Sequence, residues 1–357
     1  MSYTVKLVSA ADIDDVVTLW TLAFSLYVQN PEESETNFES CLDYFNNDLA
    51  FCYGAYDGTR LVATAGVLPY EMHLGGRFVP VGAVAAVATI PEHRRRGLVQ
   101  LLMTECLKRL HDERVPVASL WPFAYPFYER LGWATTTMQY EVSLALSTPH
   151  KLGDSRRYRI IPVSEFALAA DVHKRWIGAF SQSMTRPDTR WRRMLTHPLV
   201  NCKMFLHEDG YMVWNLKEAG DTLNVREWAY VSEGAFLDGL ELMGQMDSQF
   251  SHARFVCGDV EPLLKLGVFE PVPEIKLKPG MMTRVVNLDA FMELCPEGSL
   301  RPPVNDPLNV AGQNADGIGP GAVMQLATGF WRQPPDGPES SLAGMLAGKP
   351  AFCAEKY

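Results

Sequence analysis

The sequence lacks the features that mark a membrane protein or a metalloprotein. No apolar run is long enough to cross a bilayer, because even Leu98–Leu110 is interrupted by a glutamine, a glutamate and two basic residues. The seven cysteines are never in C-x-x-C spacing and the eight histidines show no ligand spacing, so we expect reduced thiols and no metal. The first residues do not have the shape of a signal peptide. We therefore expect a cytoplasmic protein without a membrane partner.

Basic residues are in the minority. The chain has 32 lysines and arginines against 42 aspartates and glutamates, a formal net charge of −10 at pH 7. Nucleic-acid binding depends on contacts between cations and phosphates, so this balance disfavours a nucleic-acid partner. The summed negative field favours a cationic substrate, although many cytoplasmic proteins are equally acidic without any electrostatic role.

The length of the chain suffices for two or three domains, since 47% of its 357 residues are hydrophobic. Residues 1–147 are predicted to contain helices, antiparallel strands joined at Asp57-Gly58 and Gly75-Gly76, and a last strand at Trp133–Leu144. After a polar, turn-rich segment, a second series of strands and helices is predicted. This second series contains no turn that combines basic residues with a glycine. We predict an α/β (α+β) fold with three domains, 1–147, 148–280 and 281–357.

A strand, a basic turn and a helix follow one another in the first domain. Val84–Ile90 is rich in alanine and β-branched residues, Pro91 ends it, and Arg94–Arg96 with Gly97 form the turn. The helix that follows has an apolar face made of Leu98, Leu101, Leu102, Cys106 and Leu110. Unpaired N–H groups at its start can bind a diphosphate closely, and the arginines add positive charge.

An isolated turn of this kind is usually only a solvated loop, but its context here favours a phosphate cradle. A second apolar strand, Pro116–Trp121, and an aromatic segment, Pro122–Trp133, come next. This order resembles the acetyl-CoA-binding core of the GNAT N-acetyltransferases. Arg94 and Gly97 match their R/Q-x-x-G-x-G/A turn, whereas Val99 replaces a small residue.

The whole chain resembles the Eis (enhanced intracellular survival) family of GNAT proteins. That family combines an active GNAT domain, a degenerate GNAT domain and a small sterol-carrier-like domain, and the resemblance implies the same tandem arrangement here. The stretches that carry the resemblance are His93–Leu98, Pro122–Trp133, Leu223–Trp228, Thr283–Leu288 and the ending Phe352-Cys353.

The resemblance implies an acetyl-CoA-dependent N-acetyltransferase that acts on a cationic amine, aminoglycoside-like or polyamine-like. It implies contacts to the acetyl-pantetheine arm from the backbone of Val87 and Thr89. It implies that the diphosphate is held by Arg94, Arg95, Gly97 and Leu98. It assigns the general acid to Tyr128 and the general base to the terminal carboxylate of Tyr357. Members of the family commonly form hexamers, so a homo-oligomer is implied as well.

The sequence alone allows other interpretations of Tyr128, of the acceptor and of the function class. Tyr128 can be a packed aromatic residue, with Tyr125 as a competing acid, and the acceptor can be a lysine of a protein. A non-catalytic coenzyme A sensor or a lipid carrier is the rival class. The apolar ending with Phe352, Cys353 and Tyr357 predicts a tail that is docked on the protein and buries a carboxylate.

Overall fold

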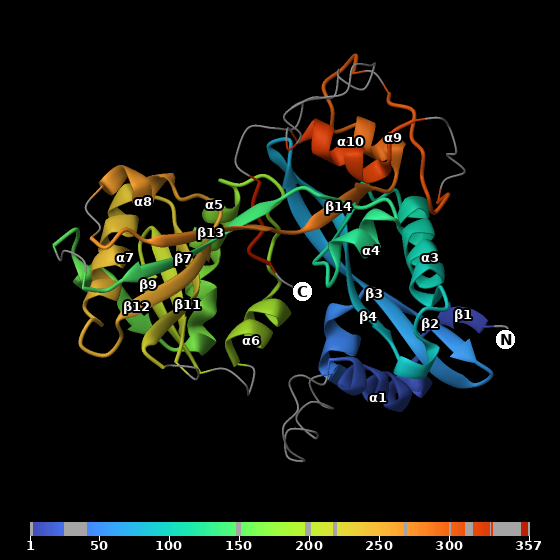
Figure 1. Ribbon diagram of the computed structural model, residues 1–357, viewed down its shortest axis with the longest axis horizontal. Helices are drawn as coiled ribbons and strands as arrows, with labels where there is room; N and C mark the ends of the chain where they lie inside the picture. Colours follow the sequence, from blue (N-terminus) through green and yellow to red (C-terminus); the bar gives the residue numbers. More distant parts are fainter. Residues whose placement is uncertain are drawn as a thin grey trace. The chain divides into compact units, whose positions relative to one another are not determined.

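Two compact units make up the described part of the chain. The computed structural model describes residues 3–24, 41–147, 151–196, 201–216, 220–267, 270–299, 301–310, 317–328, 330 and 351–355. The first unit contains the described residues up to 136 and those from 281 to 330, and the second contains 137–280 and 351–355 (Figure 1). Each unit is built on a seven-stranded sheet. No helix among these residues is long and apolar enough to span a membrane.

The first sheet is antiparallel except for one pair of strands. Its order is β1 (Tyr3–Leu7), β2 (Phe51–Asp57), β3 (Arg60–Leu74), β4 (Arg77–Thr89), β5 (Val117–Leu120), β14 (Met282–Val285) and β6 (Ala134–Thr135). β4 and β5 are parallel, and their pairing runs only from Val81–Val117 to Ala83–Ser119. β4 therefore continues to Thr89 without β5 beside it.

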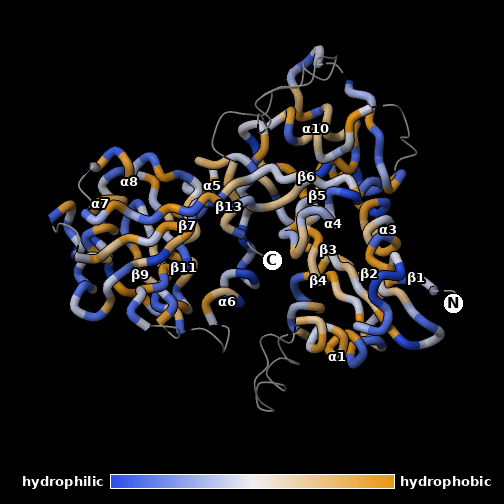
Figure 2. The backbone as a smooth tube through the Cα atoms, in the orientation of Figure 1, coloured by the Kyte–Doolittle hydropathy of each residue, from blue (hydrophilic) through white to orange (hydrophobic). Residues whose placement is uncertain are grey.

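Helices α1 (Ile13–Ala23) and α3 (Leu98–Asp112) pack on this sheet. The sequence Ser9–Asp12 has the form of a capping box, with aspartate in place of the usual glutamate. The structure confirms it, with the Ser9 N–H 2.9 Å from the Asp12 carboxylate. α3 alternates hydrophobic and hydrophilic residues (Figure 2). The prediction for its apolar face was wrong at Leu101, which is 47% exposed, because the face turned to the sheet is made of Leu98, Leu102, Met103, Cys106, Leu107 and Leu110.

The second sheet has the order β13 (Glu274–Pro279), β7 (Met138–Ala145), β12 (His252–Cys257), β11 (Thr222–Tyr230), β10 (Gly210–Asn215), β9 (Cys202–His207) and β8 (Arg159–Ile161). The helices of this unit are α5 (Ala170–Ile177), α6 (Asp188–Thr196), α7 (Glu233–Gly244) and α8 (Glu261–Leu266). Its strands at 202–207, 210–215 and 222–230 and the helix from Glu233 confirm the predicted second set of strands and helices.

The chain passes from one sheet to the other at two places that the sequence did not reveal. The predicted strand Trp133–Leu144 is divided, because β6 pairs with β14 in the first sheet while β7 pairs with β12 and β13 in the second. β14, expected to begin a separate third domain, lies between β5 and β6. The compact units thus differ from the consecutive segments 1–147, 148–280 and 281–357. Periodicity predicts that a strand forms but not which sheet it joins.

Part of the predicted third segment is helical. The sequence predicts a helix start near Asn287 or Asp289. In the structure Asn287 caps α9 (Leu288–Met292) by accepting a hydrogen bond from the Ala290 N–H at 2.9 Å. The sequence also predicts helices over Ala322–Trp331 and Leu342–Leu346. α10 (Pro320–Ala327) confirms the first over residues 322–327 but begins at Pro320. The second lies outside the described residues.

A buried ion pair ties this segment to the first unit. Arg284 on β14 is 2.7 Å from a carboxylate oxygen of Asp306, and both side chains are almost fully buried. Arg284 also donates to the carbonyl oxygen of Leu131 at 2.7 Å. Burial lowers the pKa of Arg284, which Asp306 opposes. Loss of one partner would therefore leave an uncompensated charge in the core.

The substitution Asp306→Asn should lower the free energy of unfolding by about 3–5 kcal/mol, because the Arg284 guanidinium stays buried without its counter-charge. Urea unfolding followed by tryptophan fluorescence measures this loss. Glu92→Gln is the control: it breaks an exposed pair with Arg60 and should leave the midpoint unchanged. Equal midpoints for all three proteins would contradict the role given to Arg284–Asp306.

Candidate active site

A β-bulge lies in β4 just beyond the end of its pairing with β5. Pairing with β3 passes from Gly66–Ala85 to Thr64–Ala88, so Ala86 and Val87 stand opposite a single residue. Ala86 has a φ of 53°, in the left-handed region. A bulge of this kind bends the strand and re-aims its backbone groups. Val87, Ala88 and Thr89 line a cavity at this point.

The turn after β4 leaves the start of α3 open. Arg95 and Gly97 both have left-handed backbone, with φ values of 61° and 76°. The Leu101 N–H is the first to donate within the helix, to the Gly97 carbonyl at 3.1 Å, so the N–H groups of residues 98–100 have no acceptor in the preceding turn of α3. A Cβ on Gly97 would meet nothing within 4 Å. Glycine is required there by the backbone conformation, and the space beside it is open to a ligand.

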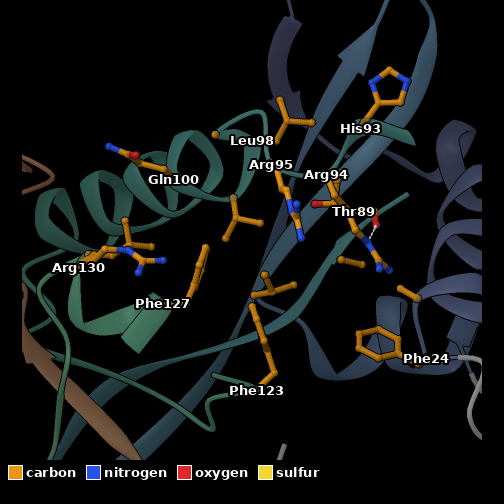
Figure 3. A pocket seen from close by; sticks show the side chains of 16 residues that line it. Phe24, Thr89, His93, Arg94, Arg95, Leu98, Gln100, Phe123, Phe127 and Arg130 are labelled. Atoms are coloured by element: carbon orange, nitrogen blue, oxygen red, sulfur yellow. Dashed lines mark hydrogen bonds between the residues drawn. The ribbon is translucent and has the colours of Figure 1, made fainter. Parts of the chain in front are cut away.

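The three arginines of the turn have different surroundings. The Arg94 Nε donates to the Thr89 carbonyl at 3.1 Å, and Arg96 donates to the Tyr3 hydroxyl at 3.0 Å. Arg94 and Arg95 line the cavity together with Arg130 from the end of α4, whereas Arg96 does not. Figure 3 shows Arg95 reaching from the turn into this space. The positive charge at the cavity therefore comes from Arg94 and Arg95 of the turn and from Arg130 of another segment.

The cavity has a volume of about 750 Å³, within the range of small-molecule sites. Arginines and open N–H groups lie where the turn meets α3. Aromatic rings line other parts of the wall: Phe24 at the end of α1, and Phe123 and Phe127 around α4 (Figure 3). Such a cavity can bind an anion against the helix start and an apolar or flexible group beside β4.

All six residues predicted to contact the cofactor line this one cavity: Val87, Thr89, Arg94, Arg95, Gly97 and Leu98. The Thr89 hydroxyl is buried and has no hydrogen-bond partner among the residues that the structure describes. Val99 also lines the cavity, so its side chain does not close the space. Sequence reasoning missed Phe24 and Arg130, and the only available signal was that Arg130 lies in the quoted segment Pro122–Trp133.

Tyr128 lies on α4 (Tyr125–Glu129), one ring behind the cavity wall. It is 2% exposed, and its ring centroid is 5.2 Å from that of Phe123 and 5.1 Å from that of Phe127, both of which line the cavity. Burial raises the pKa of Tyr128 well above its usual value, so the hydroxyl keeps its proton at neutral pH. Burial also raises the pKa of Tyr125, which is less buried.

The second unit holds a buried charge cluster that contains the chain's last described residues. Two nitrogens of Arg186 donate to Glu227 at 2.8 and 2.6 Å, and its Nε donates to Glu355. Tyr211 donates to the same Glu227, and a ring nitrogen of His173 is 2.8 Å from the Tyr211 hydroxyl. The cluster therefore connects β10, β11 and α5 of this unit to the tail.

The tail docks as its apolar residues predicted. Phe352 and Cys353 are 3% and 2% exposed, and the Phe352 N–H bonds to the Ser181 carbonyl at 3.1 Å. A Cβ on Gly258 would lie 2.4 Å from the Phe352 ring, so this glycine admits the ring. The buried carboxylate seen there belongs to Glu355. Tyr357, the predicted base, lies outside the described residues.

No group of three histidine, cysteine or acidic side chains suited to a metal ion occurs among the residues that the structure describes. The cysteines within that part of the chain are free thiols. Burial raises the pKa of Cys52 to about 12, so this thiol stays protonated and unreactive at neutral pH.

Two parts of the sequence match families of known proteins. A family described as "Acetyltransferase (GNAT) domain" matches residues 4–136, and a second family with the same description matches residues 183–285. Two GNAT domains in tandem are therefore confirmed. A sterol-carrier-like domain has no counterpart among these matches.

Curated relatives match a part of the chain. "N-acetyltransferase Eis" of Mycobacterium tuberculosis is 26% identical over 182 residues, which cover 46% of this chain and 44% of that protein. An "Uncharacterized N-acetyltransferase" of Streptomyces griseus is 32% identical over 158 residues, 42% of this chain and 38% of that protein. The match thus spans less than half the length of these relatives.

Solved structures share the fold over the full chain. A GCN5-related N-acetyltransferase from Anabaena variabilis aligns with a TM-score of 0.80 at 15% identity, and Eis1 from Mycobacterium abscessus aligns with a TM-score of 0.73 at 17% identity. Both alignments cover 100% of each chain. At these identities the likeness establishes the fold alone.

The charge cluster predicts how stability depends on pH. Burial raises the pKa of Glu227, but Arg186 and Tyr211 outweigh it and lower the pKa to about 2. Because this lies below the value of about 4.3 for an unfolded chain, the interaction stabilises the fold above about pH 4.5 and is lost as the pH falls toward 2. Glu227→Gln should therefore destabilise the protein strongly at pH 7 and much less near pH 2.

Urea unfolding of wild type and variant between pH 7 and pH 2 measures this difference. Glu233→Gln, which changes an exposed glutamate at the start of α7, is the control and should follow the wild type throughout. A difference between wild type and Glu227→Gln that stays constant over this range would contradict the lowered pKa.

Proposed function

Because the chain is an Eis-like protein of the GNAT acetyltransferase family, we propose that it is an N-acetyltransferase that transfers the acetyl group of acetyl-CoA to amines of a cationic small molecule. The observation that carries the proposal is that the bulge at Val87 and the open helix start at Gly97 line one cavity. A thioester carbonyl and a diphosphate need such groups, joined by a space for the arm between them.

The residues around the cavity fit acetyl-CoA. The N–H groups of residues 98–100, the Arg95 guanidinium and the unpartnered Thr89 hydroxyl offer hydrogen-bond donors to an anionic ligand. In the proposal, Arg94, Arg95, Gly97 and Leu98 hold the diphosphate, and backbone groups of Val87 and Thr89 hold the acetyl-pantetheine arm. We propose no cofactor site in the second domain, which has no basic glycine turn.

Acetyl transfer forms a nitrogen–carbon bond and breaks the carbon–sulfur bond, so one proton must leave the amine and one must reach the thiolate. We assign the second task to Tyr128, directly or through one water, since its raised pKa keeps the hydroxyl protonated. We assign the first task to the terminal carboxylate of Tyr357. With an ordinary pKa of about 3.3–3.7 it is a weak base, so burial or a water relay must assist it.

The proposed acceptor is aminoglycoside-like or polyamine-like, and the formal charge of −10 supports a cationic molecule. A homo-oligomer, a hexamer in particular, is proposed on the family resemblance, and a cytoplasmic location is proposed on the sequence. A sterol-carrier-like fold for residues 281–357 stays a prediction, and no step of the reaction depends on it.

A thiol-release assay with acetyl-CoA and a panel of aminoglycosides, polyamines and lysine peptides tests the proposed activity. Wild-type protein should release thiol only when an amine is present. Tyr128→Phe should reduce turnover by about 10²-fold or more, because a positioned acid is lost, and should leave the affinity for coenzyme A unchanged. Tyr125→Phe is the matched control and should keep turnover. Full turnover by Tyr128→Phe would reject the assigned acid.

Extension of the chain by one glycine after Tyr357 tests the proposed base. The extension moves the terminal carboxylate by up to about 3.5 Å and should nearly abolish turnover without changing the melting temperature. Tyr357→Phe, which keeps the carboxylate in place, should retain most of the activity. Undiminished turnover in the extended protein would exclude the terminal carboxylate as the base.

A further inference from the structure

The hydroxyl of Thr64 joins α1 to the bulge in β4. Trp20 Nε1 donates to Thr64 Oγ1 at 2.9 Å, and Thr64 Oγ1 donates to the carbonyl oxygen of Ala86 at 2.8 Å. An indole nitrogen can only donate, so the hydroxyl must accept from Trp20 and direct its single proton at Ala86. Thr64 is 0% and Trp20 3% exposed, so water cannot replace either partner.

This contact fixes the direction of the next N–H group. The carbonyl of Ala86 and the N–H of Val87 belong to the same planar trans peptide, and in such a peptide they point in opposite directions. Because the Ala86 oxygen faces Thr64, the Val87 N–H points away from Thr64. Val87 lines the cavity and has no paired residue on β3.

We propose that Thr64 is a positioning residue that holds the Ala86–Val87 peptide so that the Val87 N–H donates to the carbonyl oxygen of a bound thioester. The inference rests on the proposed function. It identifies residues that affect catalysis from outside the cavity, because neither Thr64 nor Trp20 lines it. The bound carbonyl gains negative charge as the amine attacks, so a fixed N–H stabilises the transition state more than the ground state.

The bulge needs an external partner of this kind. Ala86 is not glycine, and its φ of 53° costs about 1–2 kcal/mol relative to an extended strand. Such a conformation persists only where neighbouring groups determine it. The bulge displaces Ala86 from the register of the ladder, and its carbonyl bonds instead to the Thr64 side chain. Removal of the hydroxyl should free this peptide to rotate while the arginine turn stays intact.

Thr64→Val and Thr64→Ser form the matched pair for the test. Valine keeps the shape of threonine and removes the hydroxyl, whereas serine keeps the hydroxyl. Thr64→Val should lower turnover by about 10–100-fold, less than the full loss of an oxyanion donor, with the affinity for coenzyme A, which has no thioester carbonyl, unchanged. Thr64→Ser should keep turnover within about threefold of wild type. A melting curve of each protein confirms that it is folded.

A second readout does not depend on turnover. In ¹⁵N-labelled wild type, the Val87 amide resonance should move downfield with acetyl-CoA and not with coenzyme A, because only the former offers the carbonyl acceptor. In Thr64→Val that difference should disappear. If wild-type protein released no thiol with any amine, the proposed activity would be rejected. The shift of the Val87 amide resonance on binding acetyl-CoA would still test whether Thr64 positions this N–H group.

The inference is overturned by turnover of Thr64→Val within twofold of wild type. It is also overturned if the Val87 amide resonance of Thr64→Val still moves downfield with acetyl-CoA and not with coenzyme A. Parallel loss of turnover and coenzyme A affinity would overturn it too, since this would indicate general disruption of the site.

Discussion

The parallel pairing of β4 with β5 ends at Ala83–Ser119, and the candidate active site depends on the part of β4 that continues without β5 beside it. A strand that outruns its neighbour carries backbone groups without ladder partners. Here those groups belong to the bulge at Ala86 and Val87, and they lead into a turn whose left-handed Arg95 and Gly97 expose a helix start. An interrupted sheet thus creates a binding surface from main-chain atoms, to which Arg94 and Arg95 add charge.

Two buried charge clusters hold together segments that are distant in sequence. Arg284–Asp306 ties the chain after residue 281 to the first unit, and Arg186 ties Glu355 to the second through the pair with Glu227. In each case a guanidinium satisfies several acceptors, which compensates for burial of its charge. The Arg284–Asp306 pair lies where the chain rejoins the first sheet at β14, more than a hundred residues after β6.

Local patterns in the sequence predicted the hairpins and the strand–turn–helix motif with Arg94–Gly97, because these features depend on neighbours along the chain. The assignment of Val87, Thr89 and Leu98 to the cofactor came from the family resemblance. The membership of β7 in the second sheet and of β14 in the first was not predictable, since alternation of side chains does not specify a partner strand. Thr64 and Trp20 were missed for the same reason. Their relation to Ala86 exists only once α1 and β3 are packed together.

The proposed activity depends most directly on the binding of a diphosphate by the turn at Gly97. Calorimetric titration of the full chain with coenzyme A and with pantetheine, which lacks the diphosphate and the nucleotide, measures that contribution. We expect coenzyme A to bind at least about tenfold more tightly than pantetheine, a difference in binding free energy of about 1.4 kcal/mol or more. We expect Arg95→Ala to reduce this difference in affinity. Equal affinities for the two ligands would contradict the binding of a diphosphate by this turn.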